Sequence, residues 1–464
     1  MKSNIYKSGL AALLAGLTLT GCDPEIDAPK VDKGQANFSK YIAVGNSLTA
    51  GYMDNGLYLE GQLNSYPAIL AQQFKLAGGG AFEQPLFSEN ERNGSGYIML
   101  AGFSPTGLPD IRQVTNNTAV QPNGRFSHYN GTVNNLGVPD IRVADVKTPG
   151  YGSSGGNRYF ERIADSPSQT YLQKIQASTD HTFFTNWLGN NDVLAYATSG
   201  GFLYPITNSQ TFTENYTEVL NALTSNGAKG LVATIPEVNA VPFFNTVGPT
   251  VKQVLVASSA PGMIAMTGDQ NSKARILIPT TTIKGADGGT VLFPLTAAPY
   301  APLINQRTGK FWRDAYKQLN PGGPAIGLSL LLANYQIDTT KTFGTSTENP
   351  WPSLLLLDNT ELALIKTNTD FFNSHIKVEA AARGLAVFDS NIYFNSIQGG
   401  FTKHIVTYSP VFISGNLFSL DGVHPTPRGY AFVASEMIKA INSQYGSTLP
   451  TVDETQYRDV LFPN

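Results

Sequence analysis

The sequence predicts an α/β fold in which five parallel strands form one sheet that helices cover on both faces. Five short apolar runs, rich in β-branched and aromatic residues, alternate with helical patterns along the 464 residues. A hydrophobic content of 41% with only 14% charged residues is typical of a globular chain. The strand candidates are residues 40–45, 132–139, 182–188, 230–236 and 385–389.

Helices are predicted at residues 64–74, 213–226, 359–383 and 426–445, where apolar side chains recur on one face. Ser65 and Pro67 are typical of a helix start, and Gly227, Gly384 and Gly446 follow helix ends. Ligands of parallel sheets bind at the carboxyl ends of the strands. The residues that follow each strand are therefore the first candidates for a functional site.

The N-terminus has the pattern of an export signal. Two lysines precede an apolar stretch at residues 10–19 that is too short to span a bilayer. The next run, Leu19-Thr20-Gly21-Cys22, resembles the signal of bacterial lipoproteins. That resemblance implies removal of residues 1–21, acylation of Cys22 with palmitate-type chains, and a lipid anchor in the bacterial cell envelope, with the outer membrane as the expected location. The alternative is a signal peptide cleaved nearby with an incidental cysteine.

Residues 22–38 are polar, contain two prolines, and predict a tether ahead of a folded domain at residues 39–446. Two long segments interrupt the alternation of strands and helices, at about 81–130 and 245–355. We interpret the first, which is loop-like, as an insertion over the sheet. The second, with short alternating runs, is interpreted as a cap or substrate-facing subdomain. Residues 447–464 are predicted to form a C-terminal tail.

The first strand runs directly into Gly45-Asn46-Ser47. Gly45 permits a tight turn that would place the Ser47 side chain at the carboxyl end of the sheet. A serine at that position can serve as a nucleophile. Serine is also a preferred N-cap residue, and this short run taken alone favours the cap.

Asp421 and His424, just before the final helix, change that interpretation. Their spacing lets the carboxylate accept a hydrogen bond from one imidazole nitrogen and leaves the other nitrogen free to take a proton. The alternatives are a capped helix with an incidental histidine, or half of a metal site, but no further ligands stand at metal-binding spacing. No comparable setting surrounds the other histidines, which are His128, His181, His375 and His404.

A second candidate serine lies in a glycine-rich segment. Gly152-Ser153-Ser154-Gly155-Gly156 matches the pattern G-x-S-x-G, which requires a buried strand before the serine and a helix after it. Residues 147–151 do not have the character of such a strand. Ser154 is therefore an alternative nucleophile without the expected context.

Four short blocks, taken in order over residues 40–446, resemble the SGNH hydrolase family, also called GDSL-type esterases and lipases. Gly45-Asn46-Ser47-Leu48 is similar to the first block, with Asn46 where the family usually has aspartate. After the second block, Asn135-Leu136-Gly137, Asp140 follows Pro139 at a position where related lipoproteins often have small residues. The resemblance implies a three-layer, flavodoxin-like sandwich. The other three blocks are Asn135-Leu136-Gly137, Gly189-Asn190-Asn191-Asp192 and Asp421-Gly422-Val423-His424.

The resemblance also implies a reaction. Ser47 attacks an ester carbonyl after His424 takes its proton, and Asp421 orients the imidazole. The oxyanion is held by the backbone N–H groups of Ser47 and Gly137 and by the side-chain amide of Asn191. Neither a metal nor a cofactor is implied.

The expected substrates are carboxylic esters, either O-acyl groups on glycans or lipid and short-chain esters, and no motif decides between them. Aromatic residues in the long segments would serve sugar stacking or acyl-chain burial equally well. A net charge of −3 without a basic block argues against a nucleic-acid partner. The alternative from another class is a non-catalytic surface lipoprotein that uses the same fold to bind glycans.

Overall fold

The computed structural model describes residues 31–104 and 109–462. Cys22 and the signal-like segment lie outside the described residues. The predicted tether extends to residue 38, but its last residues belong to the fold. The N–H of Gln35 donates to the carbonyl of Tyr445, and the buried ring of Phe38 stacks on Phe74 with ring centroids 4.2 Å apart.

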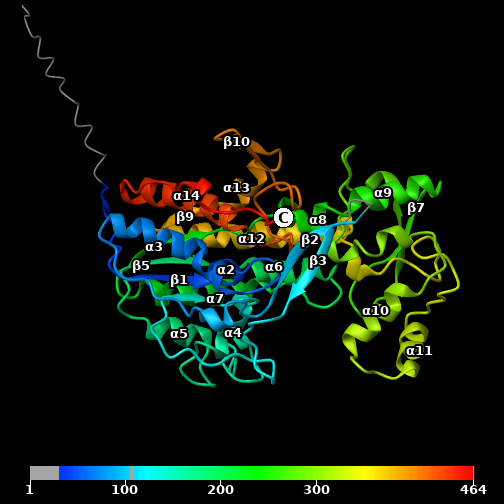
Figure 1. The fold of residues 1–464 in the computed structure, drawn as a ribbon, viewed down its shortest axis with the longest axis horizontal. Helices are drawn as coiled ribbons and strands as arrows, with labels where there is room; N and C mark the ends of the chain where they lie inside the picture. Colours follow the sequence, from blue (N-terminus) through cyan, green and yellow to red (C-terminus); the bar gives the residue numbers. More distant parts are fainter. Residues whose placement is uncertain (1–30, 105–108, 463–464) are drawn as a thin grey trace, which may run out of the picture. The chain divides into compact units, whose positions relative to one another are not determined.

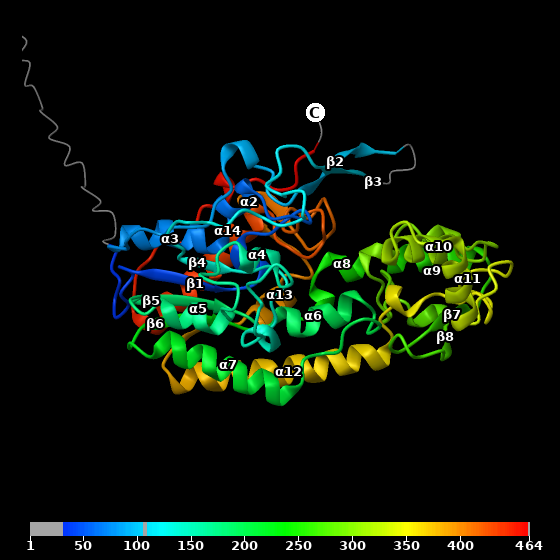
Figure 2. The same cartoon turned by 90° about the horizontal axis from the view of Figure 1, so that it is seen from below.

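The central sheet has five strands, all parallel, in the order β4-β1-β5-β6-β9. Of these five strands, β4 comes second along the chain and lies at one edge next to β1, and the others follow in sequence, as in flavodoxin-like folds (Figure 2; Figure 1 shows the sheet turned by 90°). The predicted fold class is thus confirmed. The strands are β1 (Tyr41–Gly45), β4 (Asn135–Gly137), β5 (Phe183–Trp187), β6 (Lys229–Ala233) and β9 (Ala386–Phe388).

Helices cover both faces of this sheet (Figure 2). On one face α14 packs on β9, β6 and α3, and on the other α7 packs on α5 and α12. The first residues of β1 are almost fully buried. Strands that are covered on both faces need apolar side chains on both, which explains the continuous apolar runs in the sequence. The covering helices are α3 (Tyr66–Leu76), α5 (Tyr171–Ala177), α7 (Ser209–Thr224), α12 (Asn359–Ala382) and α14 (Pro427–Tyr445).

The predicted helix starts have their capping groups in place. The Oγ of Ser65 accepts a hydrogen bond from the N–H of Ala68 at 3.4 Å, and the Oγ1 of Thr426 accepts one from Gly429 at 3.1 Å. α7 begins four residues earlier than predicted, because Asn208 provides the cap. The shorter helices are α1 (Ser47–Ala50), α2 (Leu59–Leu63), α4 (Arg158–Glu161), α6 (Asn190–Thr198), α8 (Pro242–Asn245) and α13 (Ser390–Ser396).

The segment 81–130 is not only loop. It contains an antiparallel hairpin of β2 (Tyr97–Phe103) and β3 (Pro109–Val114), with an irregular register between Leu100 and Gly102. Leu100 packs in a small buried cluster with Ile413, Leu420 and Val460. The hairpin therefore contacts the segment that leads into Asp421. A second short hairpin, β10 (Phe401–Lys403) and β11 (Val406–Tyr408), precedes that segment.

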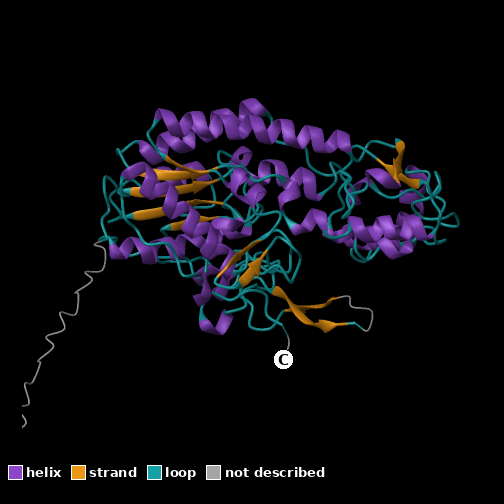
Figure 3. Cartoon of the chain, turned by 90° about the horizontal axis from the view of Figure 1, so that it is seen from above, coloured by secondary structure: helices purple, strands orange, loops and turns teal. Residues whose placement is uncertain are grey.

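Residues 247–356 have a hydrophobic cluster separate from that of the sheet. Trp351 is fully buried at its centre, and the indole N–H of the nearby Trp312 donates to the buried Asn349. Figure 3 shows these elements as short helices, loops and one small sheet. They are α9 (Gly248–Ala257), β7 (Gly262–Met266), β8 (Arg275–Pro279), α10 (Lys310–Leu319) and α11 (Ala325–Asn334).

Residues 447–462 pack on the domain. Leu449 and Val452 are buried in the main core, and the backbone of Arg458 accepts a hydrogen bond from the N–H of Arg428. Arg458 also pairs with Glu60. Among the residues that the structure describes, no helix has the length and apolar character needed to cross a membrane.

Candidate active site

Ser47 stands where β1 turns into α1. A side chain at Gly45 would place its Cβ 2.0 Å from the Oγ1 of Thr49, so the tight turn requires glycine there. The Oδ1 of Asn46 accepts a hydrogen bond from the N–H of Leu48 at 3.0 Å. Asn46 is therefore the N-cap and Ser47 the first helical residue, so the interpretation of Ser47 as a cap is wrong.

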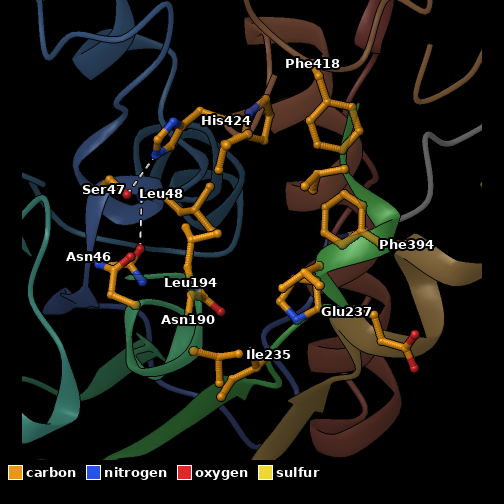
Figure 4. Close-up of a pocket in the computed structure, with 17 residues that line it drawn as sticks. Asn46, Ser47, Leu48, Asn190, Leu194, Ile235, Glu237, Phe394, Phe418 and His424 are labelled. Carbon is orange, nitrogen blue, oxygen red and sulfur yellow. Dashed lines mark hydrogen bonds between the residues drawn. The ribbon is translucent and has the colours of Figure 1, made fainter. Parts of the chain in front are cut away.

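The structure brings Ser47, His424 and Asp421 together, and Figure 4 shows the imidazole of His424 directed at Ser47. The Nε2 of His424 lies 2.8 Å from the Oγ of Ser47, and its Nδ1 lies 2.9 Å from the Oδ2 of Asp421. A carboxylate only accepts hydrogen bonds, so we infer that Nδ1 carries the proton and that the lone pair of Nε2 faces the hydroxyl. This arrangement can take the proton of Ser47 as its oxygen becomes a nucleophile.

Backbone groups hold Asp421 in place. Its Oδ1 accepts hydrogen bonds from the N–H groups of Val423 and His424, both at 2.8 Å, and its Oδ2 accepts one from Asn55 at 2.9 Å. Burial raises the pKa of Asp421, but the charge of His424 and the hydrogen bonds from His424 and Asn55 outweigh it and lower the pKa to about 2. Asp421 is therefore ionised at neutral pH.

A turn at Asp54 and Asn55, which the sequence motifs do not include, supports Asp421. Asp54 and Asn55 both have positive φ, of 51° and 58°. The Oδ1 of Asp54 accepts a hydrogen bond from the N–H of Leu420 at 3.0 Å, and its Oδ2 accepts one from the hydroxyl of Tyr58 at 2.7 Å. The run Asp54-Asn55-Gly56 is a turn signal, although its distant partner is not visible in the sequence.

The predicted oxyanion donor Gly137 is directed elsewhere. Its N–H donates to the Oδ1 of Asn135 at 2.9 Å, and it lines neither of the two cavities beside His424. A Cβ on Gly137 would lie 2.3 Å from the backbone nitrogen of Ala50. The glycine therefore allows β4 to approach α1 closely, and its N–H is already engaged.

Asn191 does reach the site. It lies in the first turn of α6 and lines both cavities beside His424. One hydrogen of its Nδ2 is directed to the carbonyl of Ile141 at 3.0 Å. An amide nitrogen has a second hydrogen, which is free for an oxyanion.

The neighbouring Asp192 holds the loop that follows β4. Its carboxylate accepts hydrogen bonds from the N–H groups of Val143 at 2.8 Å and Ala144 at 3.2 Å. Burial raises the pKa of Asp192 to about 6, against the effect of these hydrogen bonds. Asn191 and Asp192 together fix residues 139–145 against α6.

Asp140 is the residue of this loop that faces the site. It lines a cavity together with His424 and Asn191, and its φ of 69° is a left-handed conformation that favours glycine. No hydrogen bond from its N–H is found within the described parts of the chain. Asp140 is exposed as a whole, but nearby protein atoms partly remove its carboxyl group from water and raise its pKa, which the charges of His424 and Arg158 partly offset. Asp140, which stands where a small residue was expected, thus lies beside His424 in the same cavity.

Two cavities meet at His424. The first, the apolar cavity, includes Ser47. The second, the polar cleft, is larger and more open. Residues that line both are Asn191, Leu194, Val423 and His424. The apolar cavity is lined mainly by Leu48, Val193, Ile235, Val238, Phe394 and Phe418, and the polar cleft by Asn55, Asp140, Arg142, Asp145, Asn157 and Thr198.

Among the described residues, the other sequence candidates form no hydrogen bond with Ser47, Asp421 or His424. Ser154 is exposed in a turn with no strand before it. His181, His375 and His404 contact the backbone, Thr217 and Glu454 respectively. Among residues 31–104 and 109–462, no group of acidic, histidine or cysteine side chains is arranged to hold a metal.

Comparisons with known proteins add little to the geometry of the site. No protein-family model and no curated protein matches the chain. It is similar to the crystal structure of LAE5, an alpha/beta hydrolase enzyme from the metagenome of Lake Arreo, Spain, over 88% of this chain and 97% of that chain, with 11% identity and a TM-score of 0.35. A likeness of that size does not bear on the activity, which we argue from the site.

Proposed function

We propose that the protein is a serine esterase of the SGNH type that hydrolyses carboxylic esters. The observation that supports this best is the continuous hydrogen-bonded path from Ser47 through His424 to Asp421. Because Asp421 is ionised and held by backbone groups, it fixes the imidazole in the tautomer that accepts a proton.

In the proposed reaction the Oγ of Ser47 attacks the ester carbonyl while its proton passes to the Nε2 of His424. Asp421 stabilises the imidazolium without taking the proton. His424 then donates that proton to the departing alcohol. Water, activated by the same imidazole, hydrolyses the acyl-enzyme and restores Ser47.

The oxyanion would be held by the backbone N–H of Ser47, the Nδ2 of Asn191 and the backbone N–H of Asp140. This replaces Gly137 with Asp140 in the set, because the N–H of Gly137 already donates to Asn135. Hydrogen-bond donors aimed at the developing charge are usually the largest single contribution to catalysis of this kind.

Hydrolysis of p-nitrophenyl acetate by the purified protein tests the proposal. Ser47→Ala should lower kcat/KM by about 10⁴-fold or more, while the matched control Ser154→Ala retains activity. Equal activity in wild type and Ser47→Ala would exclude Ser47 as the nucleophile. Binding of glycans without hydrolysis of any ester would favour a non-catalytic binding lipoprotein.

We further propose that Cys22 is acylated and anchors the protein in the bacterial cell envelope. The support is the sequence Leu19-Thr20-Gly21-Cys22 after a short apolar stretch. Metabolic labelling with palmitate should mark the wild-type protein and leave Cys22→Ala unlabelled. Label that persists in Cys22→Ala would overturn the assignment.

A further inference from the structure

We propose that the substrate is an ester between an apolar acyl chain longer than acetyl and a neutral, polyhydroxylated alcohol. The acyl chain would enter the apolar cavity, and the alcohol would occupy the polar cleft. This inference rests on the proposed esterase function and deepens it by assigning each half of the ester to one cavity.

The apolar cavity suits a hydrocarbon chain. Figure 4 shows Leu48 and Leu194 on one side of it and the rings of Phe394 and Phe418 on the other, with Ser47 and His424 at one end. The carboxylate of Glu237 points away from the cavity, and its Oε1 lies 3.8 Å from the Nζ of Lys366. Apolar walls of this kind favour a chain by removing its surface from water, whereas the side-chain amides of Asn46 and Asn190 are polar groups in the same lining.

The polar cleft contains charged and hydrogen-bonding side chains beside apolar ones such as Ala195 and Phe243. Arg142 is paired with Asp145, with a distance of 2.7 Å between the Nη2 and Oδ1 atoms, so its charge is neutralised. Asp140 and Asp421 add negative charge to the same cleft. An anionic group such as a phosphate would therefore be repelled. Hydroxyl groups can donate to Asp140, and the half-exposed ring of Tyr204 offers a face for a sugar ring.

His424 lies at the junction of the two cavities. In the acylation step a bond forms between the Oγ of Ser47 and the acyl carbon, and the bond from that carbon to the alcohol oxygen breaks. The proton of Ser47 passes through His424 to the leaving oxygen. That oxygen must therefore lie near the Nε2 of His424 on the cleft side, while the acyl group remains with Ser47 in the apolar cavity.

The acyl half is tested with p-nitrophenyl esters of increasing chain length. The value of kcat/KM should rise about four-fold for each added methylene, or roughly 250-fold from acetate to hexanoate, until the cavity is filled. Val238→Phe, which narrows the cavity, should reduce the ratio between hexanoate and acetate at least ten-fold. Val256→Phe, at an exposed position on α9, is the matched control and should leave that ratio unchanged.

The alcohol half is tested with hexanoate esters of glucose, glycerol, cyclohexanol and glycerol phosphate. The glucose and glycerol esters distinguish a sugar from a glycerolipid source, and both should be hydrolysed at least ten-fold faster than the other two. Tyr204→Ala should lower kcat/KM for the glucose ester more than for the cyclohexanol ester. Preference for the cyclohexanol or phosphate ester would overturn the assignment of the cleft.

The outcomes separate the two proposals. Hydrolysis of acetate that depends on Ser47 but shows no gain with chain length would contradict the acyl assignment and leave the esterase function intact. Absence of hydrolysis for every ester would contradict both. A loss of chain-length preference in Val238→Phe with an unchanged melting temperature would support the apolar cavity as the acyl site.

Discussion

The Nε2 of His424 lies 2.8 Å from the Oγ of Ser47, although 377 positions separate the two residues in the chain. The sheet makes this contact possible. β1 delivers Ser47 at its carboxyl end, and the segment before α14 returns His424 to the same place. The imidazole also packs against the ring of Tyr52, with ring centroids 4.7 Å apart, which limits its rotation.

Replacement of Asp421 by Asn should lower kcat by about 10⁴-fold, because the amide favours the wrong imidazole tautomer while the shape is kept. Because the pKa of Asp421 is lowered to about 2 in the folded protein, its ionised carboxylate stabilises the fold at pH values above about 4, the pKa of an unfolded aspartate. This stabilisation is lost as the pH falls toward 2. Steady-state kinetics and acid unfolding check both effects. Near wild-type kcat in Asp421→Asn would contradict the role of the carboxylate.

Asn191→Ala should lower kcat about 10²- to 10³-fold, because one oxyanion donor is removed. Its lost hydrogen bond to Ile141 should cost only about 1 kcal/mol of stability. Kinetics and thermal unfolding of the same sample separate the two consequences. A variant with unchanged kcat would remove Asn191 from the oxyanion site.

At Asp140 the left-handed backbone predicts that Asp140→Gly is more stable than Asp140→Ala by about 1 kcal/mol. Denaturant unfolding of the two variants measures this difference directly. Equal stabilities would show that the loop relaxes to another conformation in the variants.

The carboxyl group of Glu361 should make the folding stability depend on pH. Burial, followed by the charge of Asp358, raises the pKa of Glu361 to about 8. A raised carboxyl pKa means that its stabilising contribution is fully present below the unfolded value near 4.5 and is lost as the pH rises through 8. Glu361→Gln should flatten the fall of Tm between pH 5 and 9. An identical slope in the variant would assign the pH dependence to other groups.

Much of the site could be predicted because its residues lie in short local patterns at strand ends. Gly45-Asn46-Ser47 and the pair Asp421 and His424 each occupy a few consecutive positions, and parallel strands bring such ends together. Trp187, the last residue of β5, pairs in register with Gly45 and so carries Asn191 to the same edge.

The rest depends on contacts that local patterns do not encode. Gly137 was the natural candidate for an oxyanion donor, but the hydrogen bond from its N–H to Asn135 appears only in the folded chain. Asp140 has a left-handed conformation that only a few per cent of non-glycine residues adopt, so its φ was not predictable from the sequence. The contact of Asp54 with Leu420 spans 366 positions. The helices α9, α10 and α11 within residues 247–356 were not predicted, since each has only 10 residues and lies between loops.

Covalent labelling with a reactive fluorophosphonate tests the central claim most directly, because the reagent reacts with a serine only when a neighbouring base activates it. Incubation of the folded protein should attach one phosphonyl group per chain to the peptide that contains Ser47. His424→Ala should slow the reaction by several orders of magnitude, and Ser154→Ala should react like the wild type. Labelling of a different serine, or none at all in the folded protein, would contradict the assignment of Ser47 as the nucleophile.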